Sequence, residues 1–247
     1  MFRKNILIQI PIFFFLYVQM GYAQDKAMVI HNDNGSISTI KISDIDTLKF
    51  TENFVEDIDG NVYKTVTIGT QTWMAENLRV TRYREGSAIP LVIDDDDWIG
   101  LTTGAYCFYD SSIIYEKKYG VLYNWYAVVN SNNIAPTGWH VPSEAEWEVL
   151  ANYLGGAEIA GHKLKSTSGW LNDNNGTDEV GFCGLPGGFR ASSAGDYYYI
   201  TASALFWSTT ETYNDYGVYR YLSHNNSQLD DGGGHKRNGY SVRLIKD

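Results

Sequence analysis

The densest group of oxygen ligands in the sequence lies between residues 173 and 179. Thr177 contributes a hydroxyl, and Gly176 allows a sharp turn of the backbone. Calcium takes six to eight oxygens in a flexible geometry, and a short loop supplies some of them through backbone carbonyls. The segment therefore predicts a structural calcium site whose side-chain ligands are Asp173, Asn175, Asp178 and Glu179. Ordinary turn chemistry, which requires no ion, is the alternative.

The two cysteines, Cys107 and Cys183, are the next candidates for chemistry. An even pair in an exported chain predicts a disulfide. The bond would close a loop of about 76 residues, and on the chain-entropy model it would stabilise the fold by about 4.5 kcal/mol. Two buried free thiols are the alternative.

Other catalytic and metal-binding patterns are missing from the sequence. The five histidines form no His-Glu-x-x-His motif and no pair at metal-ligand spacing. The glycine clusters lack the Gly-Lys-Ser/Thr of a phosphate-binding loop, and no Gly-x-Ser-x-Gly motif occurs. Acidic residues are plentiful, but no spacing singles out a glycosidase pair. Arg190 and Arg243 stand among apolar residues, which favours buried ion pairs. We therefore expect no enzymatic activity.

The first 23 residues have the order of a secretory signal peptide. Arg3 and Lys4 precede an apolar run, which ends at Gly21-Tyr22-Ala23 with small residues where a signal peptidase cleaves. A membrane anchor is the alternative, but the run is short for a span of about 20 residues and contains Pro11. We expect export, to the periplasm, cell surface or medium, and no membrane span in the remaining chain.

The composition excludes some partners. The formal net charge is -10, and removal of Arg3 and Lys4 with the signal peptide takes it to -12. Nucleic acids and anionic membranes both require clustered Lys and Arg, so neither is an expected partner. Seven Trp, nineteen Tyr and ten Phe fill a core or, alternatively, offer stacking platforms for sugars.

Residues 24–53 predict a small hairpin and a connector. The strand-like segment that starts at Met28 is followed by the turn signal Asn32-Asp33-Asn34-Gly35 and an apolar-rich run to Phe50.

Residues 54–247 then predict one domain of short strands. Its first turn, Asp57-Ile58-Asp59-Gly60-Asn61, has calcium-loop spacing but lacks the Glu at the twelfth position, so we expect a hairpin turn.

Two short helices are predicted inside this domain. The first has an apolar stripe from Leu122 to Val129. The second starts with a capping box, Ser143 with Glu146, and ends at Gly155-Gly156. The remaining chain predicts strands and ordered loops. Among these, we expect strands at 206–210 and 240–245, a solvated loop at 94–97 and a flexible turn at 232–234.

Several motifs, in order, resemble the Fibrobacter succinogenes major paralogous domain over about residues 55–247. They include Trp73-Met74-Ala75-Glu76-Asn77-Leu78, Tyr119-Gly120-Val121-Leu122-Tyr123-Asn124-Trp125, Gly138-Trp139-His140-Val141-Pro142-Ser143, Leu185-Pro186-Gly187-Gly188-Phe189-Arg190 and Tyr240-Ser241-Val242-Arg243. Such domains occur in exported proteins of Bacteroidetes-like bacteria, and the family has no settled activity.

Part of this pattern is also similar to the formylglycine-generating, sulfatase-modifying enzymes. The similarity implies an α+β, C-type-lectin-like fold with short strands, two short helices and extensive ordered loops, preceded by the hairpin segment. The copper-holding cysteine pair of those oxidases lies near their C-terminus, and no cysteine follows Cys183 here. The resemblance therefore extends to the fold and not to the oxidase activity, although related oxidases also hold structural calcium.

These observations predict an exported, non-catalytic module that binds glycan or another cell-surface polymer. A structural or adhesive surface protein without a small-molecule site is the first alternative, and an enzyme of unrecognised type is the second. Exposed aromatic rings over a shallow groove would favour glycan binding. A flat apolar patch would favour adhesion, and a deep pocket with convergent acidic side chains would favour catalysis. The sequence identifies neither the ligand-binding residues nor the oligomeric state.

Overall fold

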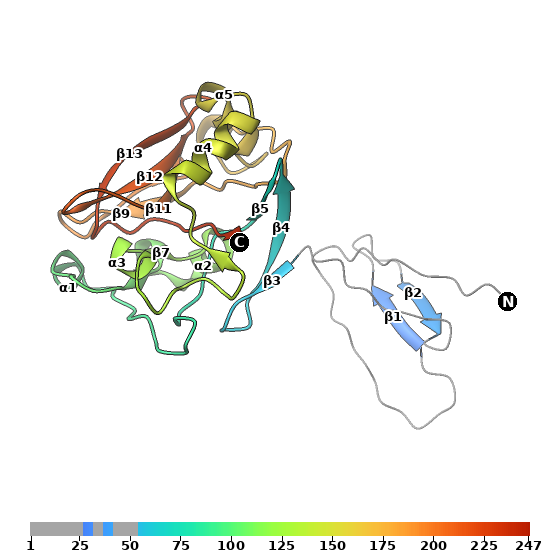
Figure 1. Ribbon diagram of the computed structural model, residues 1–247, viewed down its shortest axis with the longest axis horizontal. Helices are drawn as coiled ribbons and strands as arrows, with labels where there is room; N and C mark the ends of the chain where they lie inside the picture. The colour runs from blue at the N-terminus through green and yellow to red at the C-terminus, as the bar shows by residue number, and fades with distance from the viewer. Residues whose placement is uncertain (1–26, 32–36, 42–53) are drawn as a thin grey trace. The chain divides into compact units, whose positions relative to one another are not determined.

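Residues 27–31, 37–41 and 54–247 are the part of the chain that the computed structural model describes (Figure 1). The chain divides into two compact units, residues 1–54 and 55–247. In the first unit, β1 (Ala27–His31) and β2 (Ile37–Lys41) pair antiparallel, which agrees with the predicted hairpin. The predicted signal peptide, residues 1–23, lies outside the described residues.

The second unit is mixed α+β and consists mostly of strands in curled sheets. Its first five-stranded sheet has the order β10-β9-β11-β12-β13. These strands are β9 (Gly187–Arg190), β10 (Tyr197–Ile200), β11 (Ser203–Tyr213), β12 (Tyr216–Ser223) and β13 (Leu229–His235). Neighbouring strands pair antiparallel except β9 and β11, which are parallel.

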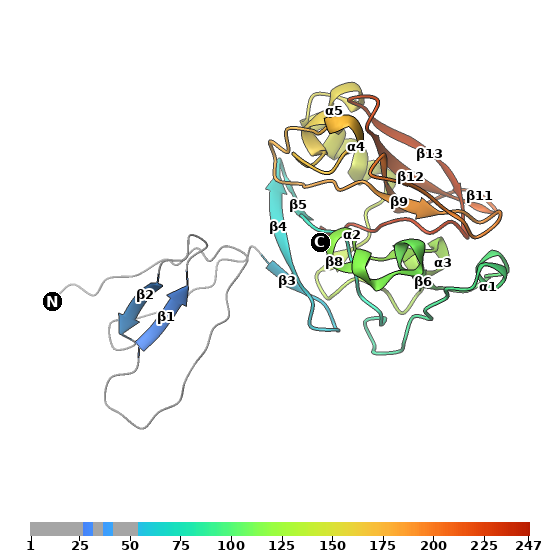
Figure 2. The ribbon, with the colours of Figure 1, turned by 180° about the vertical axis from the view of Figure 1, so that it is seen from behind.

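A second five-stranded sheet has the order β3-β4-β5-β14-β8. Its strands are β3 (Phe54–Glu56), β4 (Val62–Ile68), β5 (Gln71–Met74), β8 (Trp139–His140) and β14 (Ile245–Lys246). The last strand, β14, lies between β5 and β8, so the two ends of the domain meet in one sheet (Figure 2). A separate pair joins β6 (Tyr106–Cys107) to β7 (Leu122–Tyr123).

Five short helices accompany the sheets among the described residues. They are α1 (Asp95–Ile99), α2 (Glu116–Tyr119), α3 (Trp125–Val128), α4 (Glu144–Tyr153) and α5 (Ala157–Leu164). Single 3₁₀ turns occur at Tyr109–Ser111, Ile113–Tyr115 and Leu171–Asp173. The capping box predicted for α4 is confirmed, because the Ser143 hydroxyl accepts from the Glu146 N–H and the Glu146 carboxylate accepts from the Ser143 N–H.

The first half of the central strand β11, residues 203–208, is buried on both faces. Leu205 and Trp207 belong to one buried cluster, and Ala204 and Phe206 belong to another, because successive side chains of a strand point to opposite faces. In both views, α4 and α5 lie on one side of β11, and α2 and α3 lie on the other (Figures 1 and 2). The run Ala204-Leu205-Phe206-Trp207 is therefore continuously apolar, as expected for a strand covered on both faces.

Several elements differ from their predictions, among them the strand expected at 240–245, of which only Ile245 belongs to a strand, β14. The stripe from Leu122 to Val129 forms β7 and then the single turn α3, because Asn124 caps the turn with its side chain. The solvated loop predicted at 94–97 is the start of α1, where Asp94 accepts from the Asp97 N–H. Helix α5 was not predicted: it starts directly after Gly156, which was interpreted only as the end of α4.

The three consecutive glycines at 232–234, predicted as a flexible turn, lie within β13 and pair with β12. Gly232 and Gly234 make room for aromatic rings, whereas a Cβ on Gly233 would meet no atom closer than 3.6 Å. A Cβ on Gly234 would lie 2.7 Å from the Tyr240 ring and 2.9 Å from the Trp207 ring. Glycine is thus required by packing against this strand rather than by the geometry of a turn.

Candidate functional site

The residues predicted to bind calcium lie in a loop whose oxygens take part in local contacts. Asn175 Oδ1 accepts the backbone N–H of Trp170 at 3.1 Å. Asp178 Oδ1 accepts the backbone N–H of Cys183 at 2.7 Å. Asp173 is exposed at the end of its 3₁₀ turn. These bonds fix the path of the loop without an ion.

Two lysines also approach the calcium-loop segment. Glu179 Oε1 forms an ion pair with Lys163 Nζ at 3.0 Å, and Lys165 Nζ donates to the carbonyl of Asn174 at 3.3 Å. Within the described residues, no group of three or more His, Cys, Asp or Glu side chains could hold a metal ion. Calcium also binds amide and backbone oxygens, so the calcium site stays a prediction.

Cys107 and Cys183 are both free thiols, so the predicted disulfide is wrong. Cys107 is fully buried in β6, and burial raises its pKa to about 12. Cys183 is half-buried in the loop before β9, where burial raises its pKa as well. The two thiols lie in different surroundings, Cys107 near Tyr197 and Cys183 near Arg243, and only the tertiary structure shows this.

His140 is held between two carboxylates. Its Nε2 lies 2.7 Å from Glu146 Oε1, and its Nδ1 lies 2.5 Å from Asp247 Oδ1. Burial by itself lowers the pKa of His140, but the hydrogen bonds to Asp247 and Glu146 raise it above its ordinary value. The Ser143 hydroxyl donates to Glu146 and not to His140, so the serine–histidine contact of a hydrolase triad is missing. We call His140, Glu146 and Asp247 the carboxylate clamp.

Arg190 and Arg243 are both buried, but only Arg190 forms the predicted ion pair. Arg190 Nη2 lies 2.6 Å from Asp95 Oδ1. Arg243 donates instead to the carbonyls of Met74, Phe182 and Cys183 and to Asn77 Oδ1. Burial lowers the pKa of Arg243 to about 10. Arg243 therefore serves to join loops through their carbonyl groups.

An open groove of ≈ 820 Å³ lies where residues 93–95, 109–115 and 195–200 meet. Rings from a 3₁₀ turn, from the next 3₁₀ turn and from β10 line it. We call it the tyrosine groove after Tyr109, Tyr115, Tyr197 and Tyr198. It also contains three aspartates: Asp95, Asp110 and Asp196. All of these residues except Tyr109, which is buried, are exposed or half-buried.

The floor of the tyrosine groove is a hydrophobic cluster that fixes the rings. Trp98, Cys107 and Tyr109 belong to this cluster, and Tyr115 and Tyr197 pack against it. The ring centroids of Tyr109 and Tyr197 are 5.3 Å apart at 54°, and those of Tyr109 and Tyr115 are 5.6 Å apart at 82°. Rings that are already oriented lose little entropy when a ligand binds.

The phenol groups of Tyr197 and Tyr198 are neutral hydrogen-bonding groups. Burial raises the pKa of Tyr197 to about 12, and its hydroxyl lies 3.2 Å from Ser111 Oγ. The Tyr198 hydroxyl donates to Asp196 Oδ2 at 3.2 Å, and this hydrogen bond raises the pKa of Tyr198. Both groups are thus protonated at neutral pH and present a ring face together with a polar tip.

Arg190 stands behind the groove and joins its two sides. Its Nη1 donates to the carbonyl of Val92 at 2.7 Å, and its Nε donates to the carbonyl of Gly195 at 2.8 Å. With the carbonyl of Ile93 and the carboxylate of Asp95 as further acceptors, the guanidinium links the segment that leads into α1 with the turn before β10. The side chain is 0% exposed, so its charge does not face the groove.

Part of the backbone strain of the described chain lies beside the tyrosine groove. Nine non-glycine residues of the described chain have positive φ, and four of them adjoin this site. They are Asp110 (φ 52), Ser111 (φ 50), Tyr199 (φ 62) and Thr201 (φ 65). Bulky and β-branched residues rarely adopt this conformation. Each such residue costs about 1–3 kcal/mol, and such strain clusters at functional sites.

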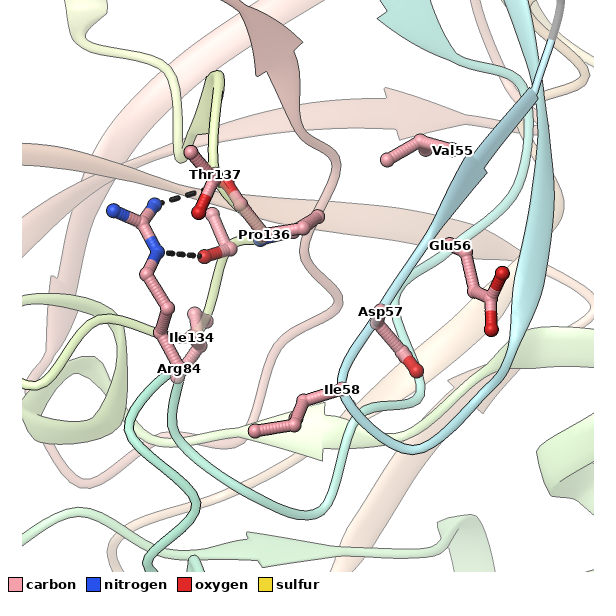
Figure 3. A pocket seen from close by; sticks show the side chains of 9 residues that line it. Val55, Glu56, Asp57, Ile58, Arg84, Ile134, Pro136 and Thr137 are labelled. Atoms are coloured by element: carbon pink, nitrogen blue, oxygen red, sulfur yellow. Dashed lines mark hydrogen bonds between the residues drawn. The ribbon is translucent and has the colours of Figure 1, made fainter.

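A second cavity of ≈ 370 Å³ lies between residues 55–58 and residues 134–137 (Figure 3). Two of its charged side chains, Arg84 and Asp57, are bound to their own surroundings, while Glu56 also lines the cavity. Arg84 donates to the carbonyls of Ala135 at 2.7 Å and Pro136 at 2.9 Å. Asp57, in the turn that joins the neighbouring strands β3 and β4 as predicted, accepts the hydroxyl of Tyr63 from β4 at 2.6 Å. The polar groups therefore stabilise loops, and the tyrosine groove is the better candidate for ligand binding.

The sequence analysis did not identify the tyrosine groove. Two local signals were present: the run of three tyrosines at 197–199 and the neighbouring pair Tyr109 and Asp110. These segments are separated by more than 80 residues in the chain, and no spacing rule connects them. Only the packing of β10 against the 3₁₀ turns brings them to one surface.

Comparison with known proteins gives one match. A family model described as the Fibrobacter succinogenes major domain matches residues 66–246. No curated protein and no solved structure matches the chain significantly. Among the described residues, no helix has the length and apolar character needed to cross a membrane.

Proposed function

The chain belongs to the Fibrobacter succinogenes major domain family, and we propose that it is a non-catalytic protein that binds glycans in its tyrosine groove. The observation that carries the proposal is the open groove lined by Tyr109, Tyr115, Tyr197 and Tyr198. Its volume of ≈ 820 Å³ lies within the range of about 300–1,000 Å³ for small-molecule sites.

The groove offers the two kinds of contact that a sugar requires. A sugar ring has an apolar face, which packs on an aromatic ring, and a rim of hydroxyls, which bond to carboxylates and phenols. Tyr115 and Tyr198 supply accessible rings, while Asp110 and Asp196 supply exposed carboxylates. Amphipathic rings of this kind bind strongly at low entropic cost.

We include the fold and the location in the proposal. The sequence motifs resemble proteins with a C-type-lectin-like fold, and the mixture of short strands, short helices and long ordered loops is consistent with it. Export, as the N-terminal segment predicts, would bring the groove into contact with polymers outside the cytoplasm. Glycan or another cell-surface polymer is therefore the proposed partner.

A glycan array with the full chain tests this function, once with calcium and once with chelator, because a calcium site is also predicted. Bound glycans are then titrated by calorimetry. The variants Tyr115→Ala and Tyr198→Ala should each weaken binding by about fivefold or more, since truncating an aromatic anchor costs more than about 1 kcal/mol. Tyr213→Ala is the matched control, because Tyr213 is 76% exposed and does not line the groove.

Two results would contradict glycan binding in this groove. One is an array without any bound glycan in either condition. The other is a bound glycan whose affinity is the same for Tyr115→Ala, Tyr198→Ala and Tyr213→Ala, because binding would then occur elsewhere on the protein.

One observation favours the alternative of an adhesive surface protein. Ile113 and Ile114, beside Tyr115, are 65% and 74% exposed. An apolar pair at the rim of a groove suits contact with another macromolecule. If adhesion is the function, Ile113→Ser with Ile114→Ser should abolish attachment to cell-surface material, while free glycans should not compete for it.

A further inference from the structure

The tyrosine groove has an acidic lining, and we infer that its ligand is a cationic glycan, namely an oligosaccharide with free, protonated amino groups. This inference rests on the proposed function and deepens it by naming the ligand class. Two independent features of the groove support it: the sign of its charges and the ring faces beside them.

The charges come from three separate elements and have one sign. Asp95 lies in α1, Asp110 in a 3₁₀ turn and Asp196 in the turn before β10. No lysine, arginine or histidine lines the groove. Arg190 partly neutralises Asp95, but from behind and with a side chain that is 0% exposed. Asp110 is exposed and accepts no hydrogen bond from the described residues. A ligand in the groove therefore meets uncompensated negative charge.

The aromatic walls favour the same kind of ligand. The face of an aromatic ring is negative, so cations bind over it within about 6 Å of the centroid. This protein already uses the interaction in the same wall, because the Arg190 guanidinium lies 5.0 Å from the Tyr197 centroid. Tyr115 and Tyr198 offer further ring faces beside Asp110 and Asp196. A protonated amino group fits between such a ring and a carboxylate.

Sulfated or uronic-acid glycans are disfavoured for the same reason. They would bring negative charge against three carboxylates in a chain whose formal net charge is already -10. Like charges in contact reduce affinity and association rate. The groove thus selects by charge as well as by shape.

The test compares oligosaccharides that share a size and differ in charge. Calorimetry with the full chain uses a hexamer of β-1,4-linked N-acetylglucosamine, its fully deacetylated form, a glucose hexamer and a sulfated glucose hexamer. The pH is mildly acidic, so that the free amino groups are protonated. We expect the deacetylated hexamer to bind at least tenfold more tightly than its acetylated form, which corresponds to about 1.4 kcal/mol. Added salt should reduce this ratio, because exposed charges are screened.

Charge-removing variants locate the effect. Asp110→Asn and Asp196→Asn keep the size and one acceptor oxygen of each side chain while removing its charge, and should each lower the preference for the deacetylated hexamer at least threefold. Asp215→Asn removes an equally exposed aspartate that does not line the groove and should leave the preference unchanged.

The outcomes separate this inference from the proposed function. Equal affinity for the acetylated and deacetylated hexamers, or tighter binding of the sulfated one, overturns the inference and leaves glycan binding intact. A preference that persists in both Asp110→Asn and Asp196→Asn overturns its assignment to this groove. Failure of every oligosaccharide to bind overturns the proposed function as well.

Discussion

Arg190 Nη2 and Asp95 Oδ1 lie 2.6 Å apart, and this contact joins β9 to the first turn of α1 behind the tyrosine groove. The two partners are unequal in burial, since the Arg190 side chain is 0% exposed and that of Asp95 is 57% exposed. Arg190 also donates to the carbonyls of Val92, Ile93 and Gly195. Its structural role therefore depends more on these carbonyls than on the ion pair.

This inequality predicts different effects for the two partners. Arg190→Leu should lower the free energy of unfolding by about 3 kcal/mol or more, because buried carbonyls lose their donors. Asp95→Asn should lower it by less than about 1 kcal/mol, because the carboxylate is exposed and screened by solvent. Urea unfolding of both variants measures the difference. If both variants lost the same free energy of unfolding, the ion pair rather than the hydrogen bonds to carbonyls would account for the contribution of Arg190.

The carboxylate clamp predicts a bell-shaped pH dependence of stability. The pKa of His140 is raised in the folded state, so its contribution is full below the unfolded value of about 6.5 and is lost as the pH rises through the folded value. The pKa of Glu146 is lowered: burial alone would raise it, but hydrogen bonds from Ser143 and His140 more than offset this. Its contribution is full above about 4.3 and is lost as the pH falls.

Thermal melting across this pH range tests the clamp. His140→Gln should remove the fall of the melting temperature on the neutral side and leave most of the fall on the acid side, which also contains other carboxylates. His235→Gln is the matched control, since the pKa of that histidine is lowered by burial rather than raised by a carboxylate. If the melting temperature of His140→Gln still fell on the neutral side as in the unmodified protein, the carboxylate clamp would not contribute to the pH dependence of stability.

Gly161 should be intolerant of alanine although it lies inside helix α5. Alanine in a helix is normally favoured over glycine by about 1 kcal/mol. Here a Cβ would lie 1.9 Å from the carbonyl oxygen of Gln228, which belongs to the backbone before β13. We expect Gly161→Ala to destabilise the protein by about 2 kcal/mol or more in urea unfolding. Gly100→Ala is the control and should be nearly neutral, because its nearest neighbours are at 3.6 Å.

The two free thiols predict a specific labelling pattern. Cys107 should stay unmodified in the native protein, because it is fully buried and its pKa is raised to about 12. Cys183 is half-buried and should react slowly, while both should react after unfolding without reductant. Mass spectrometry after alkylation counts the labels. A single species without labels after unfolding would show that a disulfide forms after all.

Local signals determined several features correctly from the sequence alone. The capping box of α4 needs only Ser143 and Glu146, which are three residues apart, and the turn at Asp57 needs only its neighbours. The antiparallel pairing of β1 and β2 is another local feature. The ordered motifs identified the family, because they extend over most of residues 66–246. Such features depend on short stretches of chain, so composition and spacing are sufficient.

The tertiary structure alone decided the features that depend on distant segments. The three glycines of β13 were interpreted as a turn because the rings of Trp207 and Tyr240, which require a glycine at Gly234, lie elsewhere in the sequence. The disulfide was predicted from the even number of cysteines, whereas in the structure both thiols are free and lie in different surroundings. The tyrosine groove joins segments that begin at Ile93, Tyr109 and Gly195. Their meeting follows from burial of the cluster beneath them, and burial is a property of the packed chain rather than of any local pattern.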